Sequence, residues 1–156
     1  MDDRFIPYVE NLHSKLESLL LMLPVTPMTL SKGMCKRGVY LLSEDGKHLY
    51  VGRSNEIRKR LRRHCRPSAT HRMAAFAFRL ARETTGKLKP TYKKGAGSRA
   101  ALVTDEAFLK AFNDAKARIR KMDVRFVEET DPTKQALLEI YVSVVLDTPY
   151  NDFDTH

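Results

Sequence analysis

The chain has 156 residues, of which 42% are hydrophobic and 30% charged, and it carries a formal net charge of +9 at pH 7. This length suits one domain with an adequate core rather than two. The longest apolar run, residues 16–25, contains Glu17 and Pro24 and is too short to cross a bilayer. The acidic start, with Asp2 and Asp3, does not resemble a signal peptide. We therefore expect no membrane association and a cytoplasmic protein, nucleoid-associated if its source is a bacterium.

The two cysteines, Cys35 and Cys65, are too few for a disulfide framework. We expect two free thiols, with a single disulfide as the alternative. The histidines at positions 13, 48, 71 and 156 have no metal-ligand spacing among themselves, so the sequence does not support a structural zinc site.

An N-terminal helix is predicted by apolar residues at positions 5, 9, 12, 16, 19 and 23, and Pro24 and Pro27 end it. We assign residues 1–30 to this helical extension. Its apolar face either packs onto the rest of the chain or forms the seam of a homodimer.

A β-hairpin and a helix are predicted next. Residues 38–43 and 47–53 are rich in β-branched, aromatic and apolar side chains, and Gly46 in the turn between them adopts positive φ at little cost. Ser54 or Asn55 then supplies the N-cap of the helix. The apolar stripe of this helix consists of Ile57, Leu61 and Cys65.

The hairpin and the helix bring four polar side chains toward one small volume. Alternation places Tyr40 on one face of the first strand, and in the second strand Tyr50 shares a face with Gly52. Arg60 and His64 are four residues apart, so they point the same way from the helix.

Residues 67–122 contain two further predicted helices and a basic loop. The first helix has an apolar stripe of Met73, Phe76, Ala77, Leu80 and Ala81 and stops near Gly86. The second is capped by Thr104 and has Phe108, Ala111, Phe112, Ala115 and Ile119 facing inward. In the loop, residues 87–99, Tyr92 and its basic neighbours either grip a nucleic-acid strand by stacking or belong to a solvated loop.

The C-terminal part begins with a strand at residues 124–127. Asp131 and Pro132 then start a helix that runs to about residue 146 and is so apolar that we expect it to be buried. Glu139 is the only charged residue of its interior. A buried carboxylate needs a cation, a metal or hydrogen bonds, and the alternative is that Glu139 faces solvent.

Positive charge is concentrated in one stretch of the sequence. Residues 53–99 carry fifteen basic and two acidic side chains, whereas residues 123–156 carry two basic and eight acidic ones. Such a block favours nucleic-acid phosphates as its partner, with salt-sensitive binding. The alternative is a solvated surface that only confers solubility.

In order along the chain, these residues resemble the motifs of the GIY-YIG nuclease superfamily. Gly38-Val39-Tyr40 and Tyr50-Val51-Gly52 take the places of the two signature triplets. The family's later residues correspond to Arg60, His64, Glu139 and Asn151. The match covers residues 37–66 and 131–152, with residues 67–122 as a helical insertion. It implies a small α+β domain over residues 31–156, with a largely antiparallel three-stranded sheet flanked by helices.

The resemblance implies a metal-dependent endonuclease acting on DNA, with structure-dependent or weak specificity. Glu139 would hold Mg²⁺ or Mn²⁺, which prefer oxygen ligands, and Arg60 would bind the scissile phosphate. Tyr40 is the first choice to activate or orient the attacking water, with His64 as its competitor. Tyr50 would orient the water or the phosphate. Asn151 would either bond within the site or cap its own loop.

The expected contacts with nucleic acid are Arg53, Arg58, Lys59, Arg62, Arg63, Arg66, Lys93, Lys94 and Arg99. Three alternatives stay open: a binding module without cleavage, a sequence-specific restriction-type enzyme, and a nuclease acting on RNA. Because no separate reader domain is recognisable, targeting must come from the insertion or from a partner protein.

Overall fold

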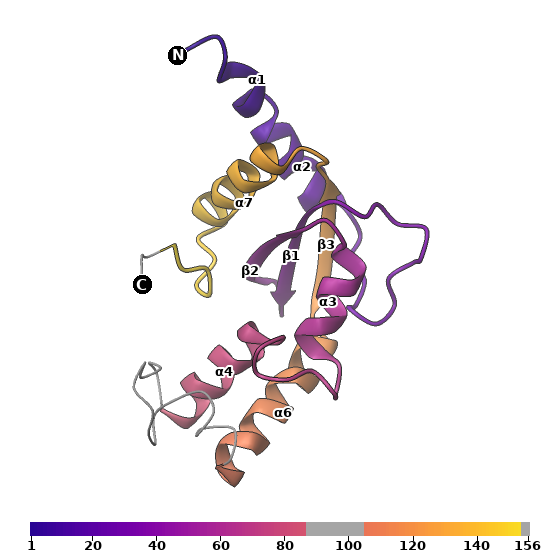
Figure 1. Cartoon of the computed structure of the whole chain (residues 1–156), viewed down its shortest axis with the longest axis vertical. Coiled ribbons are helices and arrows are strands. Elements are labelled where there is room, and N and C mark those ends of the chain that lie inside the picture. Colours follow the sequence, from indigo (N-terminus) through magenta and orange to yellow (C-terminus); the bar gives the residue numbers. More distant parts are fainter. Residues whose placement is uncertain (87–104, 154–156) are drawn as a thin grey trace. The chain divides into compact units, whose positions relative to one another are not determined.

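The computed structural model describes residues 1–86 and 105–153 (Figure 1). The chain divides into two compact units. The first unit comprises Met1–Arg60 and Met122–His156, and the second comprises Leu61–Lys121. Helix α3 (Ile57–Cys65) runs through the boundary between them.

A three-stranded antiparallel sheet forms the centre of the first unit. Strand β1 (Gly38–Glu44) lies between β2 (Lys47–Ser54) and β3 (Asp123–Glu128) (Figure 1). The hairpin turn has two residues in the left-handed region, Asp45 (φ 51°) and Gly46 (φ 78°), which is the geometry that matches strand twist. The structure is therefore the small α+β fold with flanking helices that the sequence predicts.

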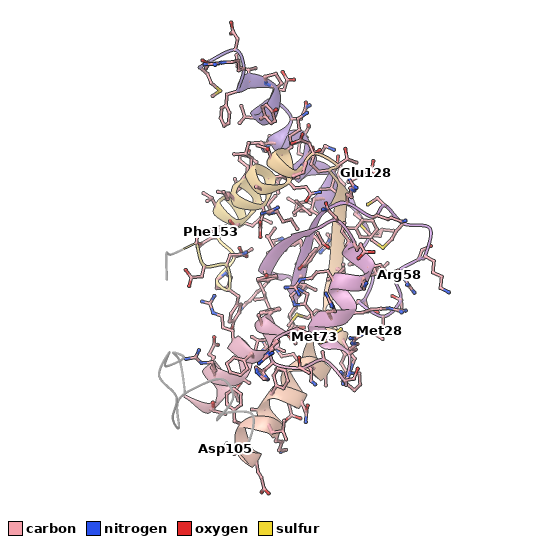
Figure 2. All side chains as sticks on the ribbon, in the orientation of Figure 1. Met28, Arg58, Met73, Asp105, Glu128 and Phe153 are labelled. Carbon is pink, nitrogen blue, oxygen red and sulfur yellow. The ribbon has the colours of Figure 1, made fainter. Side chains whose placement is uncertain are left out.

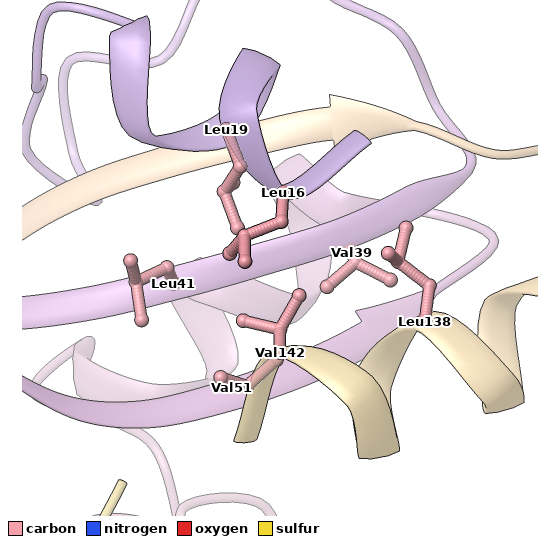
Figure 3. Packing of buried hydrophobic residues seen from close by; sticks show 7 residues of the cluster. All are labelled: Leu16, Leu19, Val39, Leu41, Val51, Leu138 and Val142. Carbon is pink, nitrogen blue, oxygen red and sulfur yellow. The ribbon is translucent and has the colours of Figure 1, made fainter. Parts of the chain in front are cut away.

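Helices α2 (Leu12–Leu21) and α7 (Pro132–Leu146) pack against one face of this sheet. Figure 3 shows the core that they share with the strands. It consists of Leu16, Leu19, Val39, Leu41, Val51, Leu138 and Val142, all nearly or fully buried. Burying each such side chain contributes about 1.5–3 kcal/mol, so the apolar face of α2 is part of the domain's own core.

The N-terminal helix is shorter than predicted and interrupted. It forms α1 (Ile6–Val9) and α2, and Asn11 is the N-cap residue that starts the second segment. Met22 takes an extended conformation ahead of Pro24, so the helix ends at Leu21 and Leu23 is 84% exposed. The prediction of one continuous helix is therefore wrong, because the outer members of its apolar pattern have no core to pack against.

Helix α7 begins as predicted but is not buried all round. The Asp131 side chain accepts a hydrogen bond from the Lys134 N–H (2.9 Å), and Pro132 occupies the first turn. On the opposite side of the helix Ile140 is 44% and Val144 70% exposed. The expectation of full burial is wrong because this helix covers a sheet with only one of its sides.

In the second unit α4 (Ala75–Thr85) packs against α6 (Glu106–Arg120) through aromatic side chains, and the rings of Phe78 and Phe108 lie 5.1 Å apart. Gly86 ends α4 in the left-handed conformation, as expected of a C-cap glycine. The residue that caps α6 is Asp105, labelled in Figure 2, which accepts from the Phe108 N–H (3.1 Å). The prediction that Thr104 is the cap is therefore wrong; its own position lies outside the described residues.

Two sequence expectations about the whole chain can be compared with the structure. Cys35 and Cys65 are both free thiols, as expected. Across residues 1–86 and 105–153, no helix combines the length and the apolar character that crossing a membrane requires.

Candidate active site

A pocket of about 420 Å³ lies along β2 in the first unit. Strands β1 and β2, the start of α3 and the first half of α7 contribute to its walls. The lining residues are Tyr40, Tyr50, Gly52, Arg53, Ser54, Asn55, Arg60, Gln135 and Glu139. The fold thus brings four of the six predicted catalytic residues, Tyr40, Tyr50, Arg60 and Glu139, into one pocket from four separate elements.

Gly52 allows the Tyr40 ring to lie across the edge strand. The two residues are direct cross-strand partners in the register of β1 and β2. A Cβ atom on Gly52 would stand 2.3 Å from the hydroxyl oxygen of Tyr40, which is far too close. The absence of a side chain at Gly52 therefore permits the close approach of the Tyr40 ring.

The Tyr40 hydroxyl is held in its neutral form. Burial raises its pKa well above the ordinary value, and the nearby Tyr50 adds to this effect. The charge and the hydrogen bond of Arg60 lower the pKa, but burial outweighs them. As it stands in this structure, Tyr40 is suited to hold and orient a reactant rather than to remove a proton.

Glu139 is paired with Arg53. The Arg53 Nε atom lies 3.0 Å from Glu139 Oε2, and the two side chains are 45% and 20% exposed. Burial raises the pKa of Glu139 above its ordinary value, while the charge and hydrogen bond of Arg53 lower it in part. The compensation that a partly buried carboxylate requires is therefore given by an arginine that the sequence placed only among the nucleic-acid contacts.

The chemistry of the pocket fits a hard divalent cation. The carboxylate of Glu139 shares the pocket with hydroxyl and amide oxygens, and these are the ligand types that Mg²⁺ and Mn²⁺ prefer. In the described part of the chain, no three His, Cys, Asp or Glu side chains gather around one point. A single carboxylate with water and phosphate oxygens completing the shell is a usual arrangement for Mg²⁺.

His64 is not among the residues that line the pocket. Its side chain is fully buried, and within the second unit its ring meets the Phe76 ring edge-on, with centroids 6.4 Å apart. A histidine without exposed surface has no access to water, so its burial disfavours the role of general base.

Asn151 supports β2 from outside the pocket. Its Oδ1 atom accepts from the Val51 N–H (2.9 Å), and its Nδ2 atom donates to the Val51 carbonyl (2.8 Å). Thr148 Oγ1 also donates to Asn151 Oδ1 (2.7 Å). The side chain thereby satisfies both backbone groups of one residue on the outer edge of the sheet, between Tyr50 and Gly52.

The basic residues predicted to contact nucleic acid differ in their exposure and in their hydrogen-bond partners. Arg58, labelled in Figure 2, donates from Nε to the Leu30 carbonyl (3.2 Å), and Lys59 pairs with Glu56 (3.7 Å). Arg63 is exposed. The Nε atoms of Arg62 and Arg66 are buried and have no hydrogen-bond partner within the described chain. Lys93, Lys94 and Arg99 lie outside the described residues.

Sequence reasoning did not assign three polar pocket residues to the site: Ser54, Asn55 and Gln135. Gln135 precedes Glu139 by four residues, so both point from the same side of α7, and this spacing was a usable signal. The sequence predicts Asn55 only as an alternative helix cap. The Ser54 hydroxyl accepts from the Glu56 N–H (2.9 Å), within the segment that precedes α3.

The sequence model of the GIY-YIG catalytic domain matches residues 36–151, which is most of the chain. The chain therefore belongs to the GIY-YIG family, as its motifs predict. This family comprises nucleases, which hydrolyse phosphodiester bonds of nucleic acids. No curated protein and no solved structure was found to match the chain.

Proposed function

We propose that this chain is a divalent-metal-dependent endonuclease that cleaves DNA with structure-dependent or weak specificity. The observation that supports the proposal is the meeting of Tyr40, Tyr50, Arg60 and Glu139 in one pocket. Each residue type has a distinct task in phosphodiester hydrolysis. The guanidinium binds the phosphate, the carboxylate holds a metal ion, and the tyrosine hydroxyls orient the attacking water.

Arg60 binds the scissile phosphate. A guanidinium donates two parallel hydrogen bonds to phosphate oxygens and offsets the negative charge that grows on them in the transition state. The interaction of Arg60 with the Tyr40 hydroxyl holds both groups at the same end of the pocket. Arg53, which is 45% exposed beside Glu139, adds a second cation for the nucleic-acid backbone.

Glu139 is the residue that would hold Mg²⁺ or Mn²⁺. When bound, such an ion supplies Lewis-acid stabilisation of the leaving oxygen. Burial raises the pKa of Glu139 and Arg53 offsets part of that rise, so this carboxylate lies where a nearby cation stabilises its charged form.

Tyr40 and Tyr50 orient the attacking water. Their ring centroids are 6.4 Å apart, with Tyr40 buried and Tyr50 partly exposed. Because burial keeps the Tyr40 hydroxyl protonated, its contribution is a fixed hydrogen bond to the water or the phosphate.

Nicking of supercoiled plasmid in Mg²⁺ or Mn²⁺ tests the proposal. We expect Arg60→Ala and Glu139→Ala each to lower the cleavage rate by about 10²-fold or more while DNA binding persists, because they remove transition-state stabilisation. Arg4→Ala and Glu17→Ala are matched controls, since both residues are exposed and neither lines the pocket. Cleavage that survives both pocket substitutions contradicts the proposal.

A nucleic-acid-binding module without cleavage is the second candidate, and the basic stretch of residues 53–99 favours it. This candidate gains support if wild type binds DNA tightly yet cleaves neither plasmid nor branched junctions. The same assay with RNA substrates decides which nucleic acid is the target.

A further inference from the structure

Two hydrogen-bonded amide side chains, those of Gln135 and Asn55, link the backbone carbonyl of Glu129 to the wall of the pocket. Gln135 is 2% exposed, and its Nε2 atom donates to the Glu129 carbonyl (2.6 Å) and to Asn55 Oδ1 (3.2 Å). Each of the two acceptors therefore takes one of the two protons on the Gln135 amide nitrogen. The pair joins the start of α7 to the segment between β2 and α3.

This arrangement fixes which way each amide points. A backbone carbonyl can only accept a hydrogen bond, so the nitrogen of Gln135 must face Glu129. The second proton of that nitrogen then requires an oxygen, which makes Oδ1 the atom of Asn55 that faces Gln135. Nδ2 of Asn55 is left with its two protons on the other side and has no protein partner in the described chain.

The charge around Asn55 favours an anion at this point. Asn55 is exposed and lines the pocket together with Arg53 and Arg60. It also lies two residues before the first residue of α3, Ile57, where the helix dipole adds positive potential. Arg53 pairs with Glu139 in the same pocket, so Arg60 is the arginine that would face an anion beside Asn55. An amide donor that shares a pocket with Arg60 and precedes a helix start is complementary to a phosphate oxygen.

We propose that Asn55 donates through Nδ2 to a non-bridging oxygen of the bound phosphodiester, and that Gln135 is the positioning residue that orients it. This inference rests on the proposed function, because the phosphodiester is the substrate of the same pocket. The competing explanation is structural, with the Asn55–Gln135 contact serving only to tie α7 to the loop before α3.

Substitutions at Asn55 separate these explanations. Asn55→Asp keeps the shape and the acceptor for Gln135 but exchanges the donor for negative charge, and Asn55→Ala removes both. We expect each to lower kcat/KM for plasmid nicking about 10- to 100-fold. Tm should stay unchanged for Asn55→Asp, which keeps the acceptor, and fall for Asn55→Ala, which leaves the buried Gln135 amide without it. Asn113→Asp and Asn113→Ala are matched controls at an exposed position of α6. Asn55 variants that cleave like wild type overturn the inference.

A double-mutant cycle tests the positioning role of Gln135. We expect Gln135→Ala to lower kcat/KM about 3- to 10-fold in the wild-type background and to have no further effect when Asn55 is already alanine. A purely structural residue would lower activity equally in both backgrounds, and that result overturns the positioning role. Because Gln135 is buried, circular dichroism must first establish that the variant folds. If it does not fold, the two Asn55 variants decide the phosphate contact.

Failure of the inference can be told from failure of the proposed function. Wild-type cleavage that needs Arg60 and Glu139 but not Asn55 overturns the inference alone. If wild type does not cleave, the proposed function fails, and affinity for a short fluorescein-labelled DNA duplex decides instead. A Kd raised about 3- to 10-fold by Asn55→Ala and Asn55→Asp, but not by the Asn113 controls, supports the contact; an unchanged Kd overturns it.

Discussion

Tyr40 and Gly52 form a pair in which one residue makes room for the other. The ring occupies the space above the glycine, and this places its hydroxyl near Arg60. A signature triplet that ends in glycine thus has a steric reason in this chain, independent of any flexibility of the glycine backbone.

Gly52→Ala should displace the Tyr40 ring. The added Cβ would lie 2.3 Å from the tyrosine hydroxyl, and we expect a loss of about 1–3 kcal/mol in the free energy of unfolding, together with loss of nuclease activity. Urea unfolding and plasmid nicking measure the two effects. Gly33→Ala is the matched control, because its Cβ would meet only Ser31 Oγ at 3.7 Å. Equal behaviour of the two variants would contradict the steric explanation.

The thiol of Cys65 should make stability depend on alkaline pH. Burial raises its pKa from 9.0 to about 11, although Arg120 and Arg62 lower it in part. The folded state therefore keeps a proton that the unfolded state loses, so stability is fully present below pH 9 and falls as pH rises toward 11.

The measurement for Cys65 is the difference in Tm between wild type and Cys65→Ala across this alkaline range. The variant loses packing at every pH but should lose less additional stability than wild type above pH 9. Parallel Tm curves for the two proteins would show that the thiol does not titrate in this way.

Strand β2 is an edge strand whose exposed groups need partners. Asn151 provides them at Val51, and the Tyr150 N–H donates to the Leu49 carbonyl (3.2 Å). The segment after α7 thereby protects the strand that carries Tyr50 and Gly52. The residue that the family motif marks is thus a support of the pocket wall in this structure.

Asn151→Ala should destabilise the protein by about 1–3 kcal/mol, because both backbone groups of Val51 lose their partner. Equilibrium urea unfolding measures the change. Asn11→Ala is a suitable control, since Asn11 is exposed and its side chain makes no cap hydrogen bond. An Asn151→Ala variant as stable as this control would contradict the prediction. It would mean that water satisfies the two backbone groups of Val51 as well as Asn151 does.

Helix α7 serves the core and the pocket from two adjoining sides. Leu138 and Val142, four residues apart, enter the core, whereas Gln135 and Glu139, also four apart, line the pocket. The two pairs are offset by three positions, so they lie about 60° apart on adjoining sides of the helix. A helix so apolar in sequence can therefore present a carboxylate to a polar pocket.

Across the whole molecule, not all of the positive charge is available to nucleic acid. In the second unit Lys116 Nζ donates to the carbonyls of Pro67 (2.8 Å) and Ala69 (2.9 Å), and Arg120 donates to the carbonyl of Cys65. These cations stabilise the end of α3 and the chain after it. Arg62 and Arg66 differ: both side chains are only partly buried, and no acceptor in the described chain engages their buried Nε atoms.

We expect DNA binding to weaken steeply with salt, and Arg62 and Arg66 to account for part of that dependence. The double variant Arg62→Gln/Arg66→Gln should reduce the slope of log Kd against log salt concentration by about 2, if each arginine neutralises one phosphate. Fluorescence anisotropy with a short DNA duplex measures the slope. Arg4→Gln is the control, because Arg4 is paired with Asp2 (3.0 Å). An unchanged slope would exclude both arginines from the contact.

Features that depend on neighbours along the chain can be predicted without a structure. The hairpin, the helix after it and the start of α7 at Asp131 follow from alternation, turn residues and caps, which act over a few positions. The ordered motifs also indicated the family and the four residues that the pocket brings together.

Features that depend on contacts between distant residues become visible only in the folded molecule. The raised pKa of Tyr40 requires burial under other elements, and the two bonds of Asn151 reach Val51, a hundred residues away. The contact between Asn55 and Gln135 spans eighty residues. The exposed side of α7 likewise reflects which faces the sheet can cover. Hydrophobic periodicity identifies a helix face that can be buried. Whether that face is buried depends on whether another helix or a sheet packs against it.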